Sequence, residues 1–397
     1  MNNQFEYKEE YRYPYRLCLN LTDACNLACQ YCFVEQNPHY MNFTIAKDAV
    51  DYALNNLKKQ NKQDTVLITY FGGEPTLMWD EIIVPLTNYI RENDFPIELN
   101  MTTNGTLLNK ERIQFLKDNK IHPLLSIDGD RKTQEYNRPC HNHNQSSFDL
   151  VMKNVPELLK AFPNLTFRST IYADTVEHTF ENYVFAIEQG FHNIFMMPDS
   201  RHDWTKKQKD ILCNEIDKIF MLNDNIFNKG IIPINFSTIQ EMYIKAIYHN
   251  NQKDINIKRS VNRCGLGTSM AAVGWDGKIY GCQEQPSNFS ENNIFYIGDI
   301  YSGINKVKHI NLLQQYNRQG ITRCENNDFC NSCLLRNECI GFNCPSTSYD
   351  LFQNFLISPE INCIWLEKIF INCITSATYL FNNNNKAFIK YLGGEKI

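Results

Sequence analysis

The chain has 397 residues, of which 43% are hydrophobic and 21% charged, a composition typical of a globular protein large enough for several domains. A formal net charge of −5 without any block of Lys or Arg excludes a general nucleic-acid-binding surface. The polar start of the chain excludes a signal peptide, and no run of ~18 apolar residues predicts a membrane span. We therefore expect a cytoplasmic protein that binds neither nucleic acid nor membrane.

Six short β-like segments alternate with amphipathic helical segments between residues 16 and 227. This alternation predicts a parallel sheet with helical crossovers, and nothing in it requires a closed eight-stranded barrel. A less regular linker is expected over 228–261, and the four asparagines at 382–385 predict a turn. The expected strands are 16–22, 64–72, 96–103, 122–128, 165–172 and 192–198, and clear helical patterns cover 44–59 and 110–120.

Fifteen cysteines are unusual in a chain without an export signal. Because the cytosol keeps thiols reduced, metal binding is favoured over a disulfide scaffold. Three cysteines lie between Cys25 and Cys32, and seven lie between Cys282 and Cys363. This distribution predicts two metal-rich regions.

The first region, LTDACNLACQYCFVE, has Cys25, Cys29 and Cys32 in a C-x3-C-x2-C spacing after the first expected strand. A structural zinc ion would need a fourth ligand, and neither Cys nor His stands nearby to supply it. Three thiolates can instead hold a [4Fe–4S] cluster and leave one iron open. Free buried cysteines or an incomplete zinc knuckle remain the alternatives.

With Phe33 directly after it, this motif resembles the signature of the radical S-adenosylmethionine (SAM) superfamily. Further motifs follow in the order of that family: FGGEP at 71–75, TTNG at 102–105, SIDG at 126–129 and an arginine on the fifth strand. The resemblance implies a partial (β/α)6 barrel of TIM type over 16–227, preceded by an extension at 1–15, with the site at the carboxyl ends of the strands. It implies SAM contacts from Phe33, Gly72, Gly73, Glu74, Thr103, Asn104, Ser126, Asp128 and Arg168.

The C-terminal third resembles the SPASM domain, an extension that holds two auxiliary [4Fe–4S] clusters. Its last interval, Cys339-x4-Cys344, is one residue longer than the usual pattern. The resemblance covers 262–375 and leaves a tail at 376–397. It implies a distal cluster on Cys330, Cys333, Cys339 and Cys363, and a proximal cluster on Cys264, Cys282 and Cys344.

The proximal cluster has only three expected ligands, because Lys258 stands where some relatives have a further cysteine. An open iron there could accept a substrate thiolate, while Cys324 and Asp276 are rival fourth ligands. A pair of zinc ribbons is the alternative for the whole region. Four cysteines fit no ligand pattern and are expected to be packed thiols: Cys18, Cys140, Cys213 and Cys373.

The resemblance implies three [4Fe–4S] clusters and reductive cleavage of SAM to a 5′-deoxyadenosyl radical. Two substrate classes compete: a ribosomal precursor peptide, for instance one that gains a thioether at Cys, and a sulfatase whose Cys or Ser becomes formylglycine. Sulfatase-maturing relatives have an Asp after the G-x4-C cysteine, where this chain has Gln283, which favours the precursor peptide. Glu284 could replace that Asp as the base.

Two kinds of protein partner are also expected. The radical chemistry needs an electron donor such as flavodoxin or ferredoxin. About sixteen residues precede the first expected strand, too few for a leader-binding domain. A leader peptide would therefore be recognised by a separate protein or by the barrel itself. A non-catalytic metal-binding scaffold is the remaining hypothesis.

Overall fold

The computed structural model describes residues 7–59, 64–251, 264–287, 293–316, 335, 344–355 and 357–393. The chain divides into two units, each assembled from segments that are separated in the sequence. The first unit comprises Met1–Ser126, Pro139–Phe162 and Ser260–Ile321, and the second comprises Ile127–Arg138, Pro163–Arg259 and Thr322–Ile397.

The sheet of the first unit has the strand order β11-β10-β9-β8-β1-β2-β3-β4. Four strands, β1 (Arg16–Asn20), β2 (Val66–Phe71), β3 (Ile97–Thr103) and β4 (Ile121–Ser126), pair in parallel. Strand β8 (Met270–Val273) pairs in parallel with the other edge of β1, and the remaining strands continue antiparallel: β9 (Lys278–Tyr280), β10 (Tyr296–Asp299) and β11 (Gly303–Ile304).

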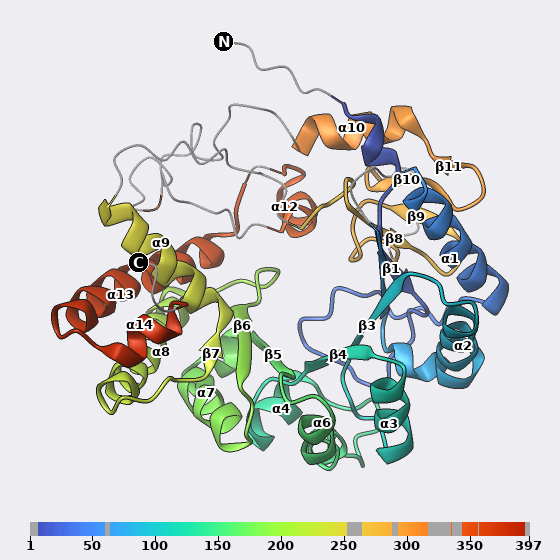
Figure 1. Ribbon diagram of the computed structural model, residues 1–397. Coiled ribbons are helices and arrows are strands. Elements are labelled where there is room, and N and C mark those ends of the chain that lie inside the picture. The colour runs from blue at the N-terminus through green and yellow to red at the C-terminus, as the bar shows by residue number, and fades with distance from the viewer. Residues whose placement is uncertain are drawn as a thin grey trace, which may run out of the picture. The chain divides into compact units, whose positions relative to one another are not determined.

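Helices of the first unit follow their strands along the chain (Figure 1), and α1 and α3 are among those that begin at a side-chain cap. Asn42 accepts from the amide of Ile45 at the start of α1 (Phe43–Leu57), and Asn109 does the same for Arg112 in α3 (Lys110–Asp118). The other helices are η1 (Glu9–Arg12), η2 (Pro75–Met78), η3 (Trp79–Ile83), α2 (Val84–Glu92), α5 (Ser147–Met152), α6 (Val155–Ala161) and α10 (Lys306–Tyr316).

The second unit contains three parallel strands, β5 (Thr166–Ile171), β6 (Asn193–Pro198) and β7 (Asn235–Phe236). Thr205 and Gln208 form a capping box that begins α8 (Lys206–Asn228). Helix α13 packs against α8 and α9, and Tyr243 of α9 meets Phe388 of α14 edge-to-face. Its helices are α4 (Arg131–Asn137), η4 (Ala173–His178), α7 (Thr179–Glu188), α8, α9 (Ser237–Asn251), α12 (Pro345–Phe352), α13 (Glu360–Asn382) and α14 (Lys386–Tyr391).

All six expected strands are confirmed, with ends that differ by at most two residues from those expected. The expected linker at 228–261 was wrong for residues 235–251, which form β7 and α9. Ile239, Met242, Tyr243 and Ala246 are buried at helical spacing, because α9 covers its unit's core with this face.

Two expected domain boundaries also differ from the structure. The boundary at 375 falls inside α13, which is continuous over Glu360–Asn382, whereas the asparagine turn does separate α13 from α14. The expected unit 262–375 is divided, since β8 extends the first unit's sheet and the residues after 321 belong to the second unit. Among the described helices, none combines the length and apolarity needed to cross a membrane.

A buried histidine ties the N-terminal segment of the first unit to α10. His309 is fully buried, its Nε2 donates to the carbonyl of Gly267, and its Nδ1 accepts from the hydroxyl of Tyr7 at 2.9 Å. Burial lowers the pKa of His309 to about 4. The imidazole is therefore neutral in the folded chain at neutral pH.

We predict that the metal-free chain loses stability between pH 6.5 and pH 4. In this window the unfolded chain binds a proton that folded His309 excludes, so the free energy of unfolding falls by about 2 kcal/mol at pH 5. His309→Gln should flatten this dependence, measured as urea unfolding at pH 5 and pH 7. Exposed His122→Gln is the control, and an unchanged pH slope in His309→Gln would contradict the assignment.

Candidate functional site

The loop after β1 carries Cys25, Cys29 and Cys32, and its ends are closed by a bridge between Thr22 and Tyr40. Cys25 and Cys29 are half-buried, whereas Cys32 is exposed. The amide of Leu27 donates to the Cys25 sulfur at 3.4 Å. The loop thus presents one thiol toward the protein interior and one toward solvent.

The glycines of the FGGEP motif permit a close backbone approach to this cysteine loop. The amide of Gly73 donates to the carbonyl of Thr22 at 2.7 Å, and the amide of Glu74 donates to that of Ala24 at 2.9 Å. A Cβ atom on Gly72 would lie 2.3 Å from the Thr22 oxygen, and one on Gly73 would lie 2.2 Å from the Ala24 oxygen. No side chain fits at either position, because backbone atoms cannot move aside.

Gly72→Ala should therefore displace the cysteine loop. Gly72 has φ +132°, so the variant combines backbone strain with the clash. We expect the free energy of unfolding to fall by about 3 kcal/mol and iron uptake on anaerobic reconstitution to be reduced. Gly230→Ala is the matched control, since its φ is also positive at +75° but a Cβ there meets nothing within 4 Å. Thermal unfolding and iron content should separate the two variants, and equal effects would argue against the clash.

Glu74 joins the FGGEP loop to the TTNG loop after β3. Its carboxylate is buried and accepts hydrogen bonds from the Thr76 hydroxyl at 2.5 Å, the Thr103 hydroxyl at 2.7 Å and the backbone amide of Asn104 at 2.8 Å. Burial raises the pKa of Glu74, while these hydrogen bonds oppose the shift. The carboxylate expected to contact SAM therefore also holds the site's own loops together.

Glu74→Gln should destabilise the chain by about 2 kcal/mol. One carboxylate oxygen becomes an NH2 group, which cannot accept from the donors around it and leaves one of them unsatisfied. Exposed Glu81→Gln is the control. Thermal unfolding of both variants tests this expectation, and equal melting temperatures would count against the network.

Asn104 connects the TTNG loop to the cysteine loop. Its Nδ2 donates to Asn26 Oδ1 at 2.9 Å and approaches the Cys25 sulfur at 3.9 Å, while its Oδ1 accepts from the Thr106 amide at 3.0 Å. Phe33 packs against a buried cluster of Cys18, Phe71 and Ala272. The segment after Cys32 is thereby anchored on β1, β2 and β8.

The donor set of this loop fits an iron–sulfur cluster. Burial and the Glu74 carboxylate raise the pKa of the Cys25 thiol to about 12, and coordination to a metal offsets such a shift by deprotonating the thiol. The Leu27 amide and the Asn104 side chain are N–H donors of the kind that tune cluster sulfurs. Within the described residues, no three Cys, His, Asp or Glu side chains converge as they would around a single ion.

In the second unit, Asp128 of the SIDG motif is buried and paired with Arg138, with 3.0 Å between its Oδ1 and Nε of the arginine. The same carboxylate accepts from the Asn137 side chain at 3.1 Å and from the Thr170 amide at 3.0 Å. These bonds link the end of α4 to β5. Asp128 therefore orders this loop, whatever contact it makes with a cofactor.

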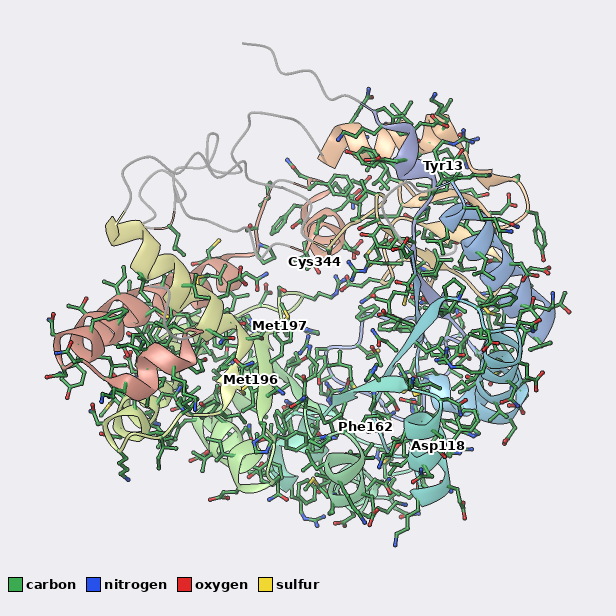
Figure 2. The ribbon with its side chains drawn as sticks, viewed as in Figure 1. Tyr13, Asp118, Phe162, Met196, Met197 and Cys344 are labelled. Atoms are coloured by element: carbon green, nitrogen blue, oxygen red, sulfur yellow. The ribbon has the colours of Figure 1, made fainter. Side chains whose placement is uncertain are left out.

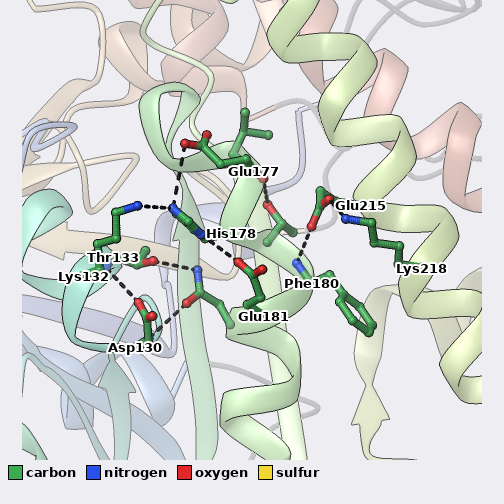
Figure 3. Close-up of polar contacts among 12 residues, drawn as sticks. Asp130, Lys132, Thr133, Glu177, His178, Phe180, Glu181, Glu215 and Lys218 are labelled. Carbon is green, nitrogen blue, oxygen red and sulfur yellow. Dashed lines mark hydrogen bonds and ion pairs between the residues drawn. The ribbon is translucent and has the colours of Figure 1, made fainter.

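The turn after Asp128 is held by the following helices (Figure 3). Asn182 of α7 accepts from the Asp130 amide at 3.0 Å and donates to the Thr133 hydroxyl at 3.1 Å. Gly129 has φ +159°, and a Cβ there would lie 1.9 Å from the Asn182 side chain. The glycine of SIDG is thus required by the packing of α7.

Arg168 on β5 is partly buried, donates to the carbonyl of Ser169 at 2.5 Å and lies over the Phe195 ring at 4.9 Å. Ser126 ends β4 and is half-buried. Their expected contacts with SAM stay predictions.

Four of the seven expected auxiliary ligands lie in the described residues: Cys264 and Cys282 in the first unit, and Cys344 and Cys363 in the second. The other three, Cys330, Cys333 and Cys339, lie outside them, as do the rival Cys324 and Lys258. Glu284 lies near enough to Cys264 to help raise its pKa, after burial. Asp276, the other rival, pairs with Lys278 at 2.9 Å.

The four cysteines expected to be packed thiols are described: Cys18, Cys140 and Cys373 are buried and Cys213 is half-buried. An arrangement not anticipated from the sequence lies beside the cysteine loop, where the His39 ring stacks on Trp275 at 4.4 Å and approaches Asp23 at 3.1 Å. More than 230 residues separate His39 and Trp275, so no local pattern could have indicated this contact.

Comparison with known proteins agrees with this geometry. Residues 19–187 match the family model of the radical SAM superfamily. The chain is similar to the radical SAM cyclopropyl synthase TigE of Paramaledivibacter caminithermalis, with 23% identity over 69% of this chain and 58% of that protein. It is also similar to a cysteine-type anaerobic sulfatase-maturating enzyme of Clostridium novyi, with 23% identity over 70% of this chain and 72% of that enzyme.

Two solved structures share the fold. Native anSMEcpe with bound AdoMet and the Cp18Cys peptide has a TM-score of 0.68 and 19% identity, covering 94% of this chain and 99% of that chain. Streptococcus suis SuiB bound to its precursor peptide SuiA has a TM-score of 0.59 and 18% identity, covering 89% and 76%.

The parallel strands β2 to β5 and the three-cysteine loop lie in the matched region, and the chain shares the fold of anSMEcpe. Residues 19–187 of the chain therefore contain a radical SAM domain. A radical SAM domain implies a [4Fe–4S] cluster and SAM as cofactors, and the expected α/β fold class is confirmed.

Proposed function

We propose that the chain is a radical SAM enzyme that modifies a peptide, with a ribosomally synthesised precursor peptide as its substrate class and a thioether at Cys as one such product. The observation that carries this proposal is the convergence of three motif loops in the first unit. Backbone bonds join Gly73 and Glu74 to the cysteine loop, and Glu74 joins both to Asn104.

Cys25, Cys29 and Cys32 would hold the SAM-binding cluster, and the backbone of Gly72 and Gly73 would border the bound SAM. When bound, the cluster and SAM supply a 5′-deoxyadenosyl radical that removes a hydrogen atom from an unactivated carbon. The chain's own residues orient this site. Phe33 fixes the segment after Cys32, and Asn104 holds the Cys25 side of the loop.

Further SAM contacts in the proposal come from Thr103, Ser126, Asp128 and Arg168. Two auxiliary [4Fe–4S] clusters complete it. Their ligands would be Cys330, Cys333, Cys339 and Cys363 for one, and Cys264, Cys282 and Cys344 for the other.

A peptide substrate is supported by two neighbours of the same fold whose structures hold peptides, anSMEcpe and SuiB. Gln283 favours a precursor peptide over a sulfatase, because its amide cannot accept a proton as a carboxylate does. The side chain of Asn20 donates to the Gln283 carbonyl at 3.3 Å. Residue 283 is thereby fixed beside the first strand.

Sulfatase maturation is the second candidate, favoured by the similarity to the Clostridium novyi enzyme. In this candidate Glu284, which follows Gln283, would be the base. An electron donor such as flavodoxin or ferredoxin, and a separate leader-binding protein, complete the proposed partners.

The deciding experiment is anaerobic purification and reconstitution, followed by iron analysis and measurement of 5′-deoxyadenosine released from SAM under dithionite. About twelve irons per chain with 5′-deoxyadenosine supports three clusters. Synthetic cysteine-bearing precursor peptides and a cysteine-bearing peptide of sulfatase sequence are then compared. A two-dalton loss in the former supports the first candidate, and formylglycine in the latter supports the second. A chain with neither iron nor SAM cleavage leaves only a non-catalytic scaffold.

We predict that Cys29→Ser lowers the iron content by about four atoms per chain and abolishes 5′-deoxyadenosine formation, since the serine hydroxyl is a poor cluster ligand. Cys213→Ser is the matched control, because Cys213 is also half-buried but fits no ligand pattern. Iron analysis and chromatography of the nucleoside measure both effects. Full iron and full SAM cleavage in Cys29→Ser would refute the assignment of the first cluster.

A further inference from the structure

A histidine–carboxylate pair lies at the carboxyl end of β6, outside every motif discussed above. Strand β6 carries Met196 and Met197 (Figure 2) and ends at Pro198, directly before Asp199. The amide of Asp199 donates to the carbonyl of Ile171, so the ends of β5 and β6 are joined. In parallel β/α folds, side chains at this end of the strands perform the chemistry.

The Asp199 carboxylate is held in place by the loop that contains it. Its side chain is only 6% exposed, and its carboxylate accepts from the amides of Arg201 and His202, both at 3.2 Å. The Trp204 indole donates to the Asp199 carbonyl at 2.8 Å. The position of this carboxylate is therefore set by the loop around it.

His202 is held by Asp199 with one ring nitrogen left open. Its Nδ1 lies 2.7 Å from Asp199 Oδ2, and its ring meets Tyr172 edge-to-face at 5.4 Å. A carboxylate only accepts hydrogen bonds, so Nδ1 carries the proton and Nε2 holds a lone pair in the neutral ring. The side chain is 42% exposed, and no described residue bonds to Nε2. This is the arrangement of a general base with its orienting carboxylate.

A second histidine of the same unit provides the contrast (Figure 3). His178 also has a carboxylate partner, with Nδ1 at 2.7 Å from Glu181. Its Nε2, however, lies 2.9 Å from the Lys132 ammonium, and its side chain is only 18% exposed. His178 is therefore a closed histidine, whereas His202 is open toward solvent.

The loop of His202 is tied to the segment that follows a proposed cluster ligand. Arg201 pairs with Asp350 of α12 at 3.1 Å, and Cys344 is the residue directly before that helix. Asp350 lies six positions after Cys344, which is roughly 9 Å along a helix. The open imidazole thus belongs to the same unit as a cysteine expected to hold the proximal cluster.

We propose that His202, positioned by Asp199, is the base that deprotonates the cysteine thiol of the peptide substrate. The S–H bond breaks, the proton passes to Nε2 of His202, and the electron pair stays on sulfur as a thiolate, so no oxidant is required. The thiolate is the form of cysteine that binds metals and attacks carbon. This inference rests on the proposed function and explains how the chain manages with Gln283 in place of a carboxylate.

The first test is independent of any substrate. The full chain, metal-free, is treated with diethyl pyrocarbonate, which acylates accessible neutral imidazole nitrogen, and modified histidines are located by mass spectrometry. We expect His202 to react about tenfold faster than His178. Equal or slower reaction of His202 would contradict the inference that its Nε2 is accessible.

The second test uses the reconstituted enzyme and the cysteine peptide that shows a two-dalton loss. About 1% of a thiol with a pKa of about 8.5 is ionised at pH 6.5 and about three quarters at pH 9. His202→Asn should therefore form product about 100-fold more slowly than the wild type at pH 6.5 but within about threefold at pH 9. SAM cleavage to 5′-deoxyadenosine, which needs no base, should stay within twofold at both pH values.

Asp199→Asn should also form product more slowly at pH 6.5 and recover at pH 9, because the imidazole of His202 loses the carboxylate that orients it. His178→Asn is the matched control and should follow the wild type at both pH values. The charged or titratable groups recorded next to His202 are Asp199, Tyr172 and the Arg201–Asp350 pair, all retained in His202→Asn.

If His202→Asn lowers the rate of product formation equally at both pH values, or does not lower it at all, His202 is not the base. Failure of the proposed function has a different signature. In that case the wild type itself releases no 5′-deoxyadenosine or modifies no peptide, whereas the acylation of His202 is unaffected.

Discussion

The close backbone approach between the FGGEP loop and the cysteine loop is the contact on which the rest of the candidate site depends. Gly72 and Gly73 lie so near Thr22 and Ala24 that no Cβ fits between them. Two amide-to-carbonyl bonds then fix the segment that leads into Cys25. Because these contacts are made by backbone alone, the close approach of the two loops does not depend on any side chain.

Glu74 extends this constraint from two loops to three. Its carboxylate is buried, which costs free energy, and the hydroxyls and amides of Thr76, Thr103 and Asn104 offset that cost. In the second unit the carboxylate of Asp128 is also buried, and its pairing with Arg138 offsets the cost of that burial. Carboxylates expected at the cofactor therefore have an architectural task as well. Substitutions at these positions will change stability and activity together, so activity alone cannot define their role.

The second unit adds a side chain that the motifs do not contain. Asp199 and His202 lie on the loop after β6, and the exposed Nε2 of His202 distinguishes it from His178, whose two nitrogens are both engaged. If His202 is the substrate base, the motif loops of the first unit and the loop after β6 have separate tasks. The former would bind the proposed radical-generating cofactors, and the latter would prepare the substrate for reaction.

The sequence by itself indicated the chemistry proposed for this protein and the positions of its first six strands along the chain. The cysteine spacing, the four later motifs and the strand–helix alternation are local patterns, since each depends on residues close together in the chain. Even the helix missed at 237–251 had such a pattern, in Ile239, Met242, Tyr243 and Ala246. Which strands pair and which distant side chains touch was decided only by the tertiary structure. The pairing of β8 with β1, the stacking of His39 on Trp275 and the join between β5 and β6 that places Asp199 each unite residues distant in sequence, and only the folded chain brings such residues together.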